Sequence, residues 1–294
     1  MDERPYIGRF APSPTGHLHF GSLIAAVASY CDAKANNGSW LVRIEDLDPP
    51  REVAGSADDI LRTLEGFGLF WDDSVQYQRT RHQLYDIAIQ TLSDLGKTFG
   101  CACSRKDLEQ SGGLKFYPGT CRNGISGKRD ARSIRFLVDS SDSVDLIWED
   151  MVQGHKSSLK SSVGDFILRR ADGYFAYHLA VVVDDADQGI TNIVRGADLI
   201  DSTPNHLLLQ QALNVSSPRY AHIPLAYNIL ENKLSKFTKA SPIQISNAPQ
   251  QIFDALKFLG QQKITIDSPT IMLSQAVNQW DISRVPRTSD THWD

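Results

Sequence analysis

Residues 9–22, RFAPSPTGHLHFGS, combine a turn rich in proline and glycine with side chains suited to binding an anion. The apolar run at 6–10 predicts a strand before this turn, and the apolar spacing after Ser22 predicts a helix. A helix that follows such a turn presents free backbone N–H groups and the positive end of its dipole to a phosphate. Gly21 allows a ligand to approach the backbone closely, and His19 can donate a hydrogen bond to a phosphate oxygen. The stretch therefore predicts a phosphate site.

A second candidate for phosphate chemistry lies at residues 233–237, which read KLSKF. Two lysines on a loop after the last expected strand suit the charge that develops on departing pyrophosphate. Strings of this kind arise often by chance, so the string is weak when it is taken alone. Of its two lysines, Lys236 is the stronger candidate.

Groups that complement an acidic amino acid are placed near the ends of expected strands. Glu45 directly follows the expected strand at 39–44, and the carboxyl ends of parallel strands border ligand sites. Arg195 ends another expected strand, and a guanidinium is the natural bidentate partner of a carboxylate. Tyr177 begins a run, 177–183, that we expect to be a buried strand. The alternative for Glu45 is a surface acid in a turn. Taken alone, Tyr177 is better explained as a core tyrosine whose hydroxyl contacts water.

Three of the four cysteines gather at Cys101, Cys103 and Cys121. In a chain whose N-terminus shows no signal-peptide pattern, clustered thiols indicate a metal before a disulfide. Zinc prefers four tetrahedral ligands, and this segment contains no histidine, so the residue types leave the fourth ligand open. The alternative is three reduced cysteines on a flexible loop.

Several of these motifs resemble those of one enzyme class. HFGS at residues 19–22 resembles the HIGH box of class I aminoacyl-tRNA synthetases, and KLSKF resembles their KMSKS loop. RFAPSPTG at 9–16 and RIEDLD at 43–48 resemble the glutamyl branch of that class. Phe237 replaces the final serine of the loop motif, which leaves both lysines in place. The resemblance runs from Tyr6 to about Lys239, whereas the alternative is a proline-rich loop that caps an ordinary βα unit.

The resemblance implies a role for each group of residues. The implied glutamate site consists of Arg9, Phe10, Ala11, Pro12, Ser13, Glu45, Tyr177 and Arg195. The implied ATP site consists of His19, Gly21, Ser22 and Lys236, and the implied catalytic residues are His19, Gly21, Lys233 and Lys236. ATP enters as a substrate with Mg²⁺. The resemblance also implies a structural zinc site formed by Cys101, Cys103, Tyr117 and Cys121.

The length of the chain selects one branch of this class. Full-length glutamyl-tRNA synthetases continue with helical domains that read the anticodon, and residues 240–294 leave no room for them. Short proteins with these motifs resemble the glutamyl-Q tRNA(Asp) synthetase family, whose members activate glutamate without tRNA and attach it to queuosine at the wobble position of tRNA-Asp. The alternatives are a short glutamyl-tRNA synthetase that charges a tRNA 3′ end and a catalytically silent RNA-binding relative. Intact Arg9, His19 and Lys236 argue against the silent relative.

The expected fold is α/β, a doubly wound Rossmann-like class I synthetase catalytic domain with an insertion. Its two halves are expected at 1–98 and 166–240, an inserted basic zinc-binding subdomain at 99–165, and a short C-terminal helical segment at 241–294, with no anticodon-binding domain. Further strands are expected at 133–138, 144–149, 166–169, 190–195 and 220–225, and helices at 57–67, 80–95, from Thr203 and at 249–259. A capping box is expected at Thr80.

Composition bounds the remaining expectations. The 294 residues are 41% hydrophobic, which supports a sizeable core, and the net charge is −5. Residues 101–136 contain eight lysines and arginines against three acids, so this segment is locally basic. A basic patch of this kind is either an electrostatic footprint for RNA or a solvated loop. Without an apolar run of membrane-spanning length or a signal peptide, we expect a cytoplasmic monomer with no membrane span.

Overall fold

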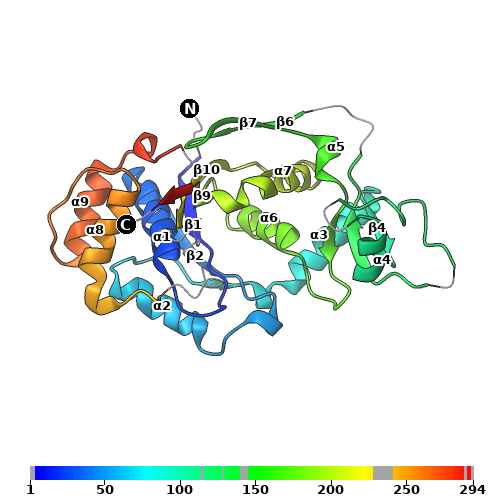
Figure 1. The fold of residues 1–294 in the computed structure, drawn as a ribbon, viewed down its shortest axis with the longest axis horizontal. Helices are drawn as coiled ribbons and strands as arrows, with labels where there is room; N and C mark the ends of the chain where they lie inside the picture. Colours follow the sequence, from blue (N-terminus) through cyan, green and yellow to red (C-terminus); the bar gives the residue numbers. More distant parts are fainter. Residues whose placement is uncertain are drawn as a thin grey trace.

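The computed structural model of the chain describes residues 4–113, 116–127, 129–139, 145–227, 241–287 and 290–292. Its centre is a mostly parallel sheet formed by two sets of strands (Figure 1). The first set pairs in the order β1 (Ile7–Phe10), β2 (Ser39–Ile44) and β3 (Gln76–Tyr77). The second set has the order β9 (Asn192–Gly196), β10 (Arg219–Ile223), β6 (Asp145–Asp150) and β7 (Gly154–Leu159), in which only β7 is antiparallel to its neighbour.

The two sets of strands meet at β1 and β9. The backbone N–H of Thr191 donates to the carbonyl oxygen of Ile7 at 2.9 Å, and β1 lies against β9. In the resulting order, β3-β2-β1-β9-β10-β6, the strands that follow β1 in the chain are added on one side of it, and those that follow β9 are added on the opposite side. In doubly wound sheets the ligand crevice opens at the carboxyl ends of the strands at this point. The predicted doubly wound fold is therefore confirmed, and it places Phe10 and Gly196 at the edge of the expected site.

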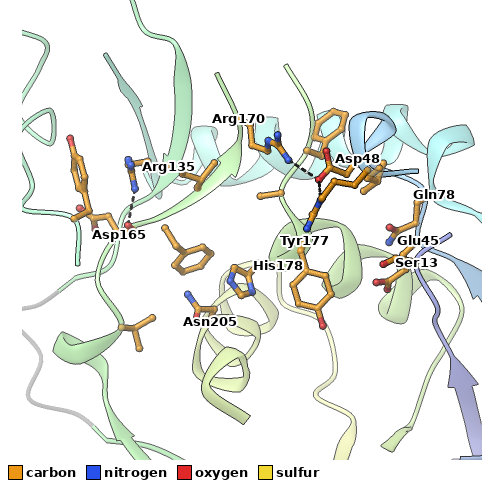
Figure 2. Close-up of a pocket in the computed structure, with 18 of the residues that line it drawn as sticks. Ser13, Glu45, Asp48, Gln78, Arg135, Asp165, Arg170, Tyr177, His178 and Asn205 are labelled. Atoms are coloured by element: carbon orange, nitrogen blue, oxygen red, sulfur yellow. Dashed lines mark hydrogen bonds and ion pairs between the residues drawn. The ribbon is translucent and has the colours of Figure 1, made fainter. Parts of the chain in front are cut away.

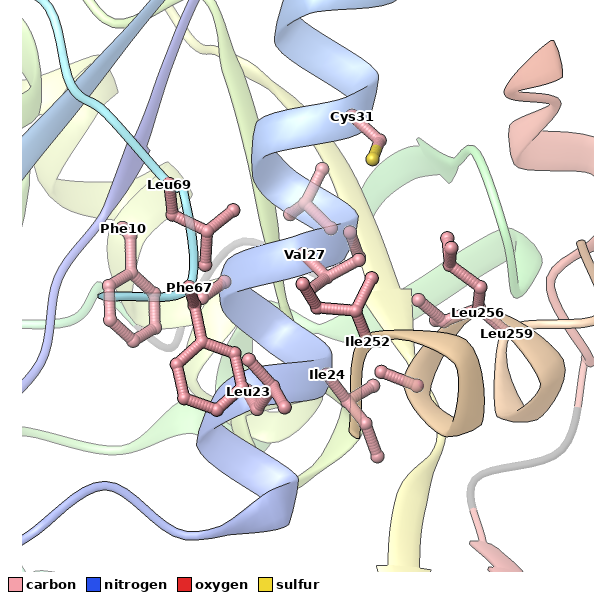
Figure 3. Close-up of a cluster of buried hydrophobic side chains, with 14 of the residues drawn as sticks. Phe10, Leu23, Ile24, Val27, Cys31, Phe67, Leu69, Ile252, Leu256 and Leu259 are labelled. Atoms are coloured by element: carbon pink, nitrogen blue, oxygen red, sulfur yellow. The ribbon is translucent and has the colours of Figure 1, made fainter. Parts of the chain in front are cut away.

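One hydrophobic cluster holds α1 (Phe20–Ala35) against the sheet and against the C-terminal helices. Figure 3 shows Leu23, Ile24 and Val27 of α1 between aromatic side chains on one side and the helix α8 (Ala248–Phe258) on the other. Full burial of such a side chain stabilises the fold by roughly 1.5–3 kcal/mol. The core around α1 therefore fixes the helix whose N-terminus borders the predicted phosphate site. The other helices of this end are α2 (Ser56–Gly66) and α9 (Pro269–Gln279).

A second cluster lies on the far side of the sheet. It joins α3 (His82–Asp94), α6 (Tyr177–Asp187) and α7 (Thr203–Ala212) through buried residues such as Tyr85, Leu179 and Leu209. The cluster also includes Phe136 and Phe166, which belong to elements at the opposite end of the molecule from α8 and α9 (Figure 1). The elements at that end are β4 (Thr98–Cys101), α4 (Arg105–Gln110), β5 (Ser133–Phe136), α5 (Lys160–Val163) and β8 (Phe166–Arg169).

Short elements complete the described chain. Two strands, β11 (Leu225–Tyr227) and β12 (Asp290–His292), pair in parallel. Turns of 3₁₀ helix lie at Pro49–Arg51, Gln78–Thr80, Ala197–Ser202, Ile245–Asn247 and Ile282–Arg284. None of the described helices combines the length and the apolar character that crossing a membrane requires.

The expected strand at 177–183 is wrong, because these residues begin the helix α6. A short run of apolar residues does not distinguish a strand from a buried helix, and the valines of this run favoured the strand. The helix turns Asp184 and Asp185 inward, where both are buried against arginines. Tyr177 is consequently the first residue of a helix rather than the end of a strand.

Three further differences concern the start of one helix, the pairing of one strand and one additional helix. The capping box expected at Thr80 is wrong, because α3 begins at His82 and Thr80 instead donates to the carbonyl of Tyr77 in a 3₁₀ turn. The strand at 166–169 is confirmed, but β8 pairs with β5 in the antiparallel sheet β4-β5-β8 rather than with the central sheet. The helix α9 is not among the helices expected from the sequence, because its short buried face, including Met272 and Leu273, is a weak signal.

Candidate active site

A cavity of about 700 Å³ opens at the carboxyl ends of β1 and β9. Every residue predicted for the glutamate and ATP sites that the structure describes lines this cavity. They are Arg9, Phe10, Ala11, Pro12, Ser13, His19, Gly21, Ser22, Glu45, Tyr177 and Arg195. Lys233 and Lys236 lie outside the described residues. The fold thus brings together groups that are up to 186 positions apart in the chain, from Arg9 to Arg195.

The proline-rich turn is held in place by hydrogen bonds between its backbone and residues outside the turn. The N–H of Glu45 donates to the carbonyl of Pro12 at 3.0 Å, and the N–H of Val53 donates to that of Pro14 at 2.9 Å. The buried hydroxyl of Ser56 accepts from the Gly16 N–H at 3.0 Å and donates to the Gly16 carbonyl at 2.8 Å. Gly16 has a φ of +127°, a conformation that suits glycine. The turn is therefore a fixed wall of the cavity.

His19 is the N-cap of α1. Its Nδ1 atom accepts from the backbone N–H of Ser22 at 3.3 Å, and its Nε2 atom lies 3.0 Å from the Ser22 hydroxyl. Because Nδ1 accepts, the proton of the neutral ring lies on Nε2. That N–H and the first turn of α1 border the same cavity, so this end of the helix can bind phosphate oxygens.

A network of buried charges orders Arg9 and Glu45. Asp185 lies 3.2 Å from Arg9 Nε and 2.8 Å from a terminal nitrogen of Arg43, and Arg43 also lies 3.4 Å from Glu45. Burial would raise the pKa of Asp185, but the two arginines lower it below its usual value. Within the described chain the bond to Asp185 is the only hydrogen bond of the Arg9 side chain, so its terminal nitrogens remain for a ligand.

Glu45 has the opposite balance. Burial raises its pKa above the usual value, although Arg43 and Arg9 both favour the charged carboxylate. A ligand ammonium beside Glu45 would add the positive charge that stabilises its ionised form. This is the behaviour expected of a carboxylate that completes its ion pair only when a ligand is bound.

Arg195 is buried, and its partners among the described residues are all neutral. Its guanidinium bonds to His222, His206, Thr203 and the carbonyl of Leu199 at 2.9–3.2 Å. Among the described residues no carboxylate lies within ion-pair distance of it. An arginine buried without a counter-charge is costly, so its presence in the wall of a cavity indicates an anionic ligand.

Tyr177 borders two cavities at once. Its ring packs against His178 and His206, with centroids 5.4 and 5.6 Å away. Burial raises the pKa of Tyr177 to about 12, so its hydroxyl stays protonated. Of the described residues none bonds to this hydroxyl, which leaves it for a ligand.

The second cavity is larger, about 1010 Å³, and it lies between the central domain and the β4-β5-β8 sheet. Figure 2 shows Ser13, Glu45 and Gln78 on one side, Arg135 and Asp165 on the other, and Tyr177 and His178 between them. The two cavities share Ser13, Thr15, Glu45 and Tyr177. A molecule in the larger cavity therefore reaches the groups that border the smaller one.

The three clustered cysteines converge in the structure as the sequence predicts. Their sulfur atoms lie within 4.8 Å of one another, and those of Cys103 and Cys121 are 3.7 Å apart. Tetrahedral Zn–S bonds of about 2.3 Å place sulfur atoms about 3.8 Å apart. The Tyr117 hydroxyl lies 3.3 Å from the sulfur of Cys101 and 3.8 Å from that of Cys103. The cluster therefore fits a metal ion, and Tyr117 is placed to be its fourth ligand.

The surroundings of the cluster favour a metal as well. Burial opposes the thiolate of Cys101, but hydrogen bonding with Tyr117 and Arg135 brings the pKa of Cys101 down to about 7. Arg135 also lies over the Tyr117 ring, 3.9 Å from its centroid. Cys101 and Cys121 are buried but belong to none of the hydrophobic clusters found among the described residues. A metal would supply the cohesion that an apolar core supplies elsewhere.

The basic excess of the insertion is partly neutralised by local acids. Arg122 pairs with Asp165 at 2.6 Å, and Arg129 pairs with Asp107 at 3.1 Å. Lys115 and Lys128 lie outside the described residues. The RNA-binding surface inferred from charge alone therefore stays a prediction. Fewer basic side chains lack an acidic partner than the sequence count indicates.

Sequence reasoning missed the residues that orient the two predicted arginines. Arg43 and Asp185 order Arg9, and His206 and His222 contact Arg195. The pair Asp184-Asp185 was a visible signal, because two acids stand side by side directly after an apolar run. His222 had only its place in an expected strand, which gives no hint of its partner.

The comparisons with known proteins agree with this geometry. Residues 7–259 match the family described as "tRNA synthetases class I (E and Q), catalytic domain". Proteins named glutamyl-Q tRNA(Asp) synthetase from Dechloromonas aromatica (strain RCB) and Chromobacterium violaceum are each 49% identical, over 97% of this chain and 97% of the relative. A glutamate tRNA ligase from Elizabethkingia meningosepticum, solved with its amino acid, superposes with a TM-score of 0.84 at 23% identity. That likeness covers 99% of this chain and 67% of the other, and it establishes the fold.

Proposed function

Because the chain belongs to the class I tRNA synthetases of the glutamyl and glutaminyl type, we propose that it activates glutamate with ATP and transfers it to a tRNA. The acceptor that we propose is queuosine at the wobble position of tRNA-Asp, since relatives that match nearly the whole chain are named for that tRNA. The observation that carries glutamate activation is the pairing in one cavity of two arginines, Arg9 and Arg195, with one acid, Glu45. Glutamate presents two carboxylates and one ammonium, which is the complementary set.

The first step joins glutamate to AMP. A carboxylate oxygen of glutamate attacks the α-phosphorus of ATP, and the bond to pyrophosphate breaks. Arg9, Ser13, Tyr177 and Arg195 hold the carboxylates, while Glu45 pairs with the ammonium group. His19 and the first turn of α1 bind phosphate oxygens, and Lys236 offsets the charge on pyrophosphate as it departs. Mg²⁺ that arrives with ATP supplies further charge neutralisation.

The second step uses the larger cavity. A hydroxyl of the acceptor nucleoside attacks the carbonyl of glutamyl-adenylate, and AMP leaves. The larger cavity adjoins the smaller one at Ser13 and Tyr177, so an acceptor in it reaches the bound adenylate. The insertion that forms its far wall then contacts the RNA, which gives the basic residues of that segment their proposed role.

Adenylate formation should require glutamate and ATP alone. All of the proposed glutamate contacts lie outside the 99–165 segment that we expect to contact RNA, so the glutamate site does not need bound RNA to form. Pyrophosphate exchange into ATP, measured without any RNA, should proceed at full rate and should not rise when tRNA is added. An absolute requirement for tRNA would instead favour an ordinary glutamyl-tRNA synthetase.

The acceptor is tested separately. Transfer of labelled glutamate should occur to tRNA-Asp that carries queuosine and not to tRNA-Asp that lacks it. Charging of tRNA-Glu at its 3′ end would support the short glutamyl-tRNA synthetase in place of this proposal.

Zinc is the proposed structural metal, held by Cys101, Cys103, Tyr117 and Cys121. Replacing Cys103 with serine should lower bound zinc from one per chain and should impair transfer to RNA. It should leave pyrophosphate exchange largely intact, because the adenylate site lies outside the insertion. Elemental analysis of protein purified without chelator measures the metal. Cys31→Ala is the matched control, because it removes the thiol outside the cluster without burying a hydroxyl in the core around α1. Full transfer activity in zinc-free protein would contradict the proposal.

The remaining expectations stay predictions. They are the division of the chain at residues 98, 165 and 240, a cytoplasmic location and a monomeric state. The placement of β8 in the sheet β4-β5-β8 bears on the second division, because it joins Phe166–Arg169 to the insertion through strand pairing.

A further inference from the structure

Asp150 and His222 form a buried pair beside the proposed glutamate site. Asp150 ends β6 and His222 lies on the neighbouring strand β10, and both side chains are buried. His222 Nδ1 lies 2.5 Å from Asp150 Oδ2. The other oxygen of Asp150 accepts from the backbone N–H groups of Val152, Gln153 and His222 at 2.8–3.1 Å. Burial would raise the pKa of Asp150, but the bonds to His222 and to the backbone lower it, so the carboxylate is ionised.

This pair determines which nitrogen of His222 carries the proton. An ionised carboxylate only accepts hydrogen bonds, so Nδ1 of His222 must be the donor. Burial lowers the pKa of His222. The hydrogen bond to Asp150 raises this pKa and the charge of Arg195 lowers it, so the net shift is downward and the ring is neutral. Its Nε2 atom is then a bare acceptor, and it lies 2.9 Å from the Nε–H of Arg195.

The remaining bonds of Arg195 follow the same pattern. A guanidinium has donors only, so His206 Nδ1, Thr203 Oγ1 and the Leu199 carbonyl must all accept from it. These acceptors fix the plane of the guanidinium without neutralising its charge. An acid in direct contact would compete with a ligand carboxylate, whereas Asp150 acts from one imidazole ring away.

We propose that Asp150 and His222 are positioning residues that orient Arg195 toward a carboxylate of glutamate. The inference rests on the proposed function, in which Arg195 contacts glutamate. It assigns Asp150 the task of holding His222 in the tautomer that accepts from Arg195, as buried carboxylates do for histidines at other sites. The strand pairing of β6 with β10 thereby becomes part of the amino-acid site.

The test is Asp150→Asn, which preserves shape and removes the charge. The amide oxygen can keep the backbone N–H bonds, which turns the amide NH₂ toward His222 Nδ1. His222 must then carry its proton on Nε2, where it faces the donor of Arg195. We expect the glutamate KM and the glutamate Kd to rise about tenfold or more, the size that loss of one charge-assisted hydrogen bond gives. The ATP KM should stay within about twofold, since a displaced Arg195 affects glutamate alone.

Two comparisons separate positioning from a general effect on folding. Asp32→Asn removes another buried carboxylate, one that bonds to Tyr6 and Trp280 away from the site, and should leave the glutamate KM unchanged. His222→Gln supplies an amide oxygen near the Nε2 position and needs no proton on Nδ1. The double variant Asp150→Asn with His222→Gln should therefore bind glutamate better than Asp150→Asn alone. An equal or worse glutamate Kd in the double variant would overturn the proposal.

A direct observation does not depend on any variant. ¹⁵N NMR of histidine-labelled wild-type protein should show His222 neutral with its proton on Nδ1, and a proton on Nε2 would overturn the inference.

If Arg195→Ala raises the glutamate KM while Asp150→Asn does not, the positioning role is wrong and the proposed function stands. If Arg195→Ala itself has no effect on glutamate, the assignment of Arg195 to the glutamate site fails first.

Discussion

Replacing Arg195 with alanine should raise the glutamate KM in pyrophosphate exchange while leaving the ATP KM nearly unchanged. The guanidinium is buried, and none of the described residues supplies a carboxylate to pair with it, so the substrate is its expected counter-ion. Loss of a charge-assisted bond typically costs on the order of 1.5–3 kcal/mol, or roughly ten- to a hundredfold in affinity.

The controls for this change are Arg195→Lys and Arg122→Ala. Lysine keeps the charge but lacks the planar fork that His222 and Thr203 orient, so it should restore only part of the glutamate affinity. Arg122 pairs with Asp165 in the insertion, and its loss should not change the glutamate KM. An unchanged glutamate KM in Arg195→Ala would remove Arg195 from the site.

The sequence predicted correctly those site residues whose positions are set by their near neighbours in the chain. The strand, turn and helix around 9–22 can be predicted from the sequence because apolar spacing, prolines and glycines act over a few consecutive residues. The structure places this stretch as predicted, with His19 at the N-cap of α1. The same holds for Glu45, which directly follows β2 as expected.

The groups that orient the site were not readable, because they come from distant strands. Asp150 and His222 are 72 residues apart, and they meet only because β6 pairs with β10. No local pattern marks such a pair. The strand predicted at 177–183 failed for a related reason, since α6 buries Leu179 and Val182 in an apolar cluster with α3 and α7, which come from distant parts of the chain. This tertiary packing overrode the preference of its valines for a strand.

The KLSKF loop illustrates a different limit. Its residues lie outside the described part of the chain, so the assignment of Lys233 and Lys236 rests on the sequence and on the family. The described cavity nevertheless indicates what the lysines of this loop do. His19 and the first turn of α1 can bind phosphate oxygens at one wall, but pyrophosphate also gains charge as it leaves, and that charge needs a cation.

Replacing Lys236 with alanine should therefore slow adenylate formation by about 10²–10³-fold, the cost of removing one group that stabilises a developing charge. The glutamate Kd should stay close to that of the wild type, because the lysine acts on the transition state rather than on bound glutamate. Single-turnover formation of glutamyl-adenylate in a quenched-flow instrument measures the chemical step, and equilibrium binding measures the Kd. Lys236→Arg should recover part of the rate, since it restores the charge with a different shape.

Lys263→Ala is the matched control for this change, because Lys263 is an exposed lysine near the C-terminal helices. It should leave both the rate of adenylate formation and the glutamate Kd unaltered. The opposite pattern in Lys236→Ala, with a normal chemical step and weakened ATP binding, would show that the lysine only holds ATP in its ground state. The loop would then contribute to affinity, and the developing charge on pyrophosphate would have to be stabilised by other groups of the cavity, with His19 as the first to replace.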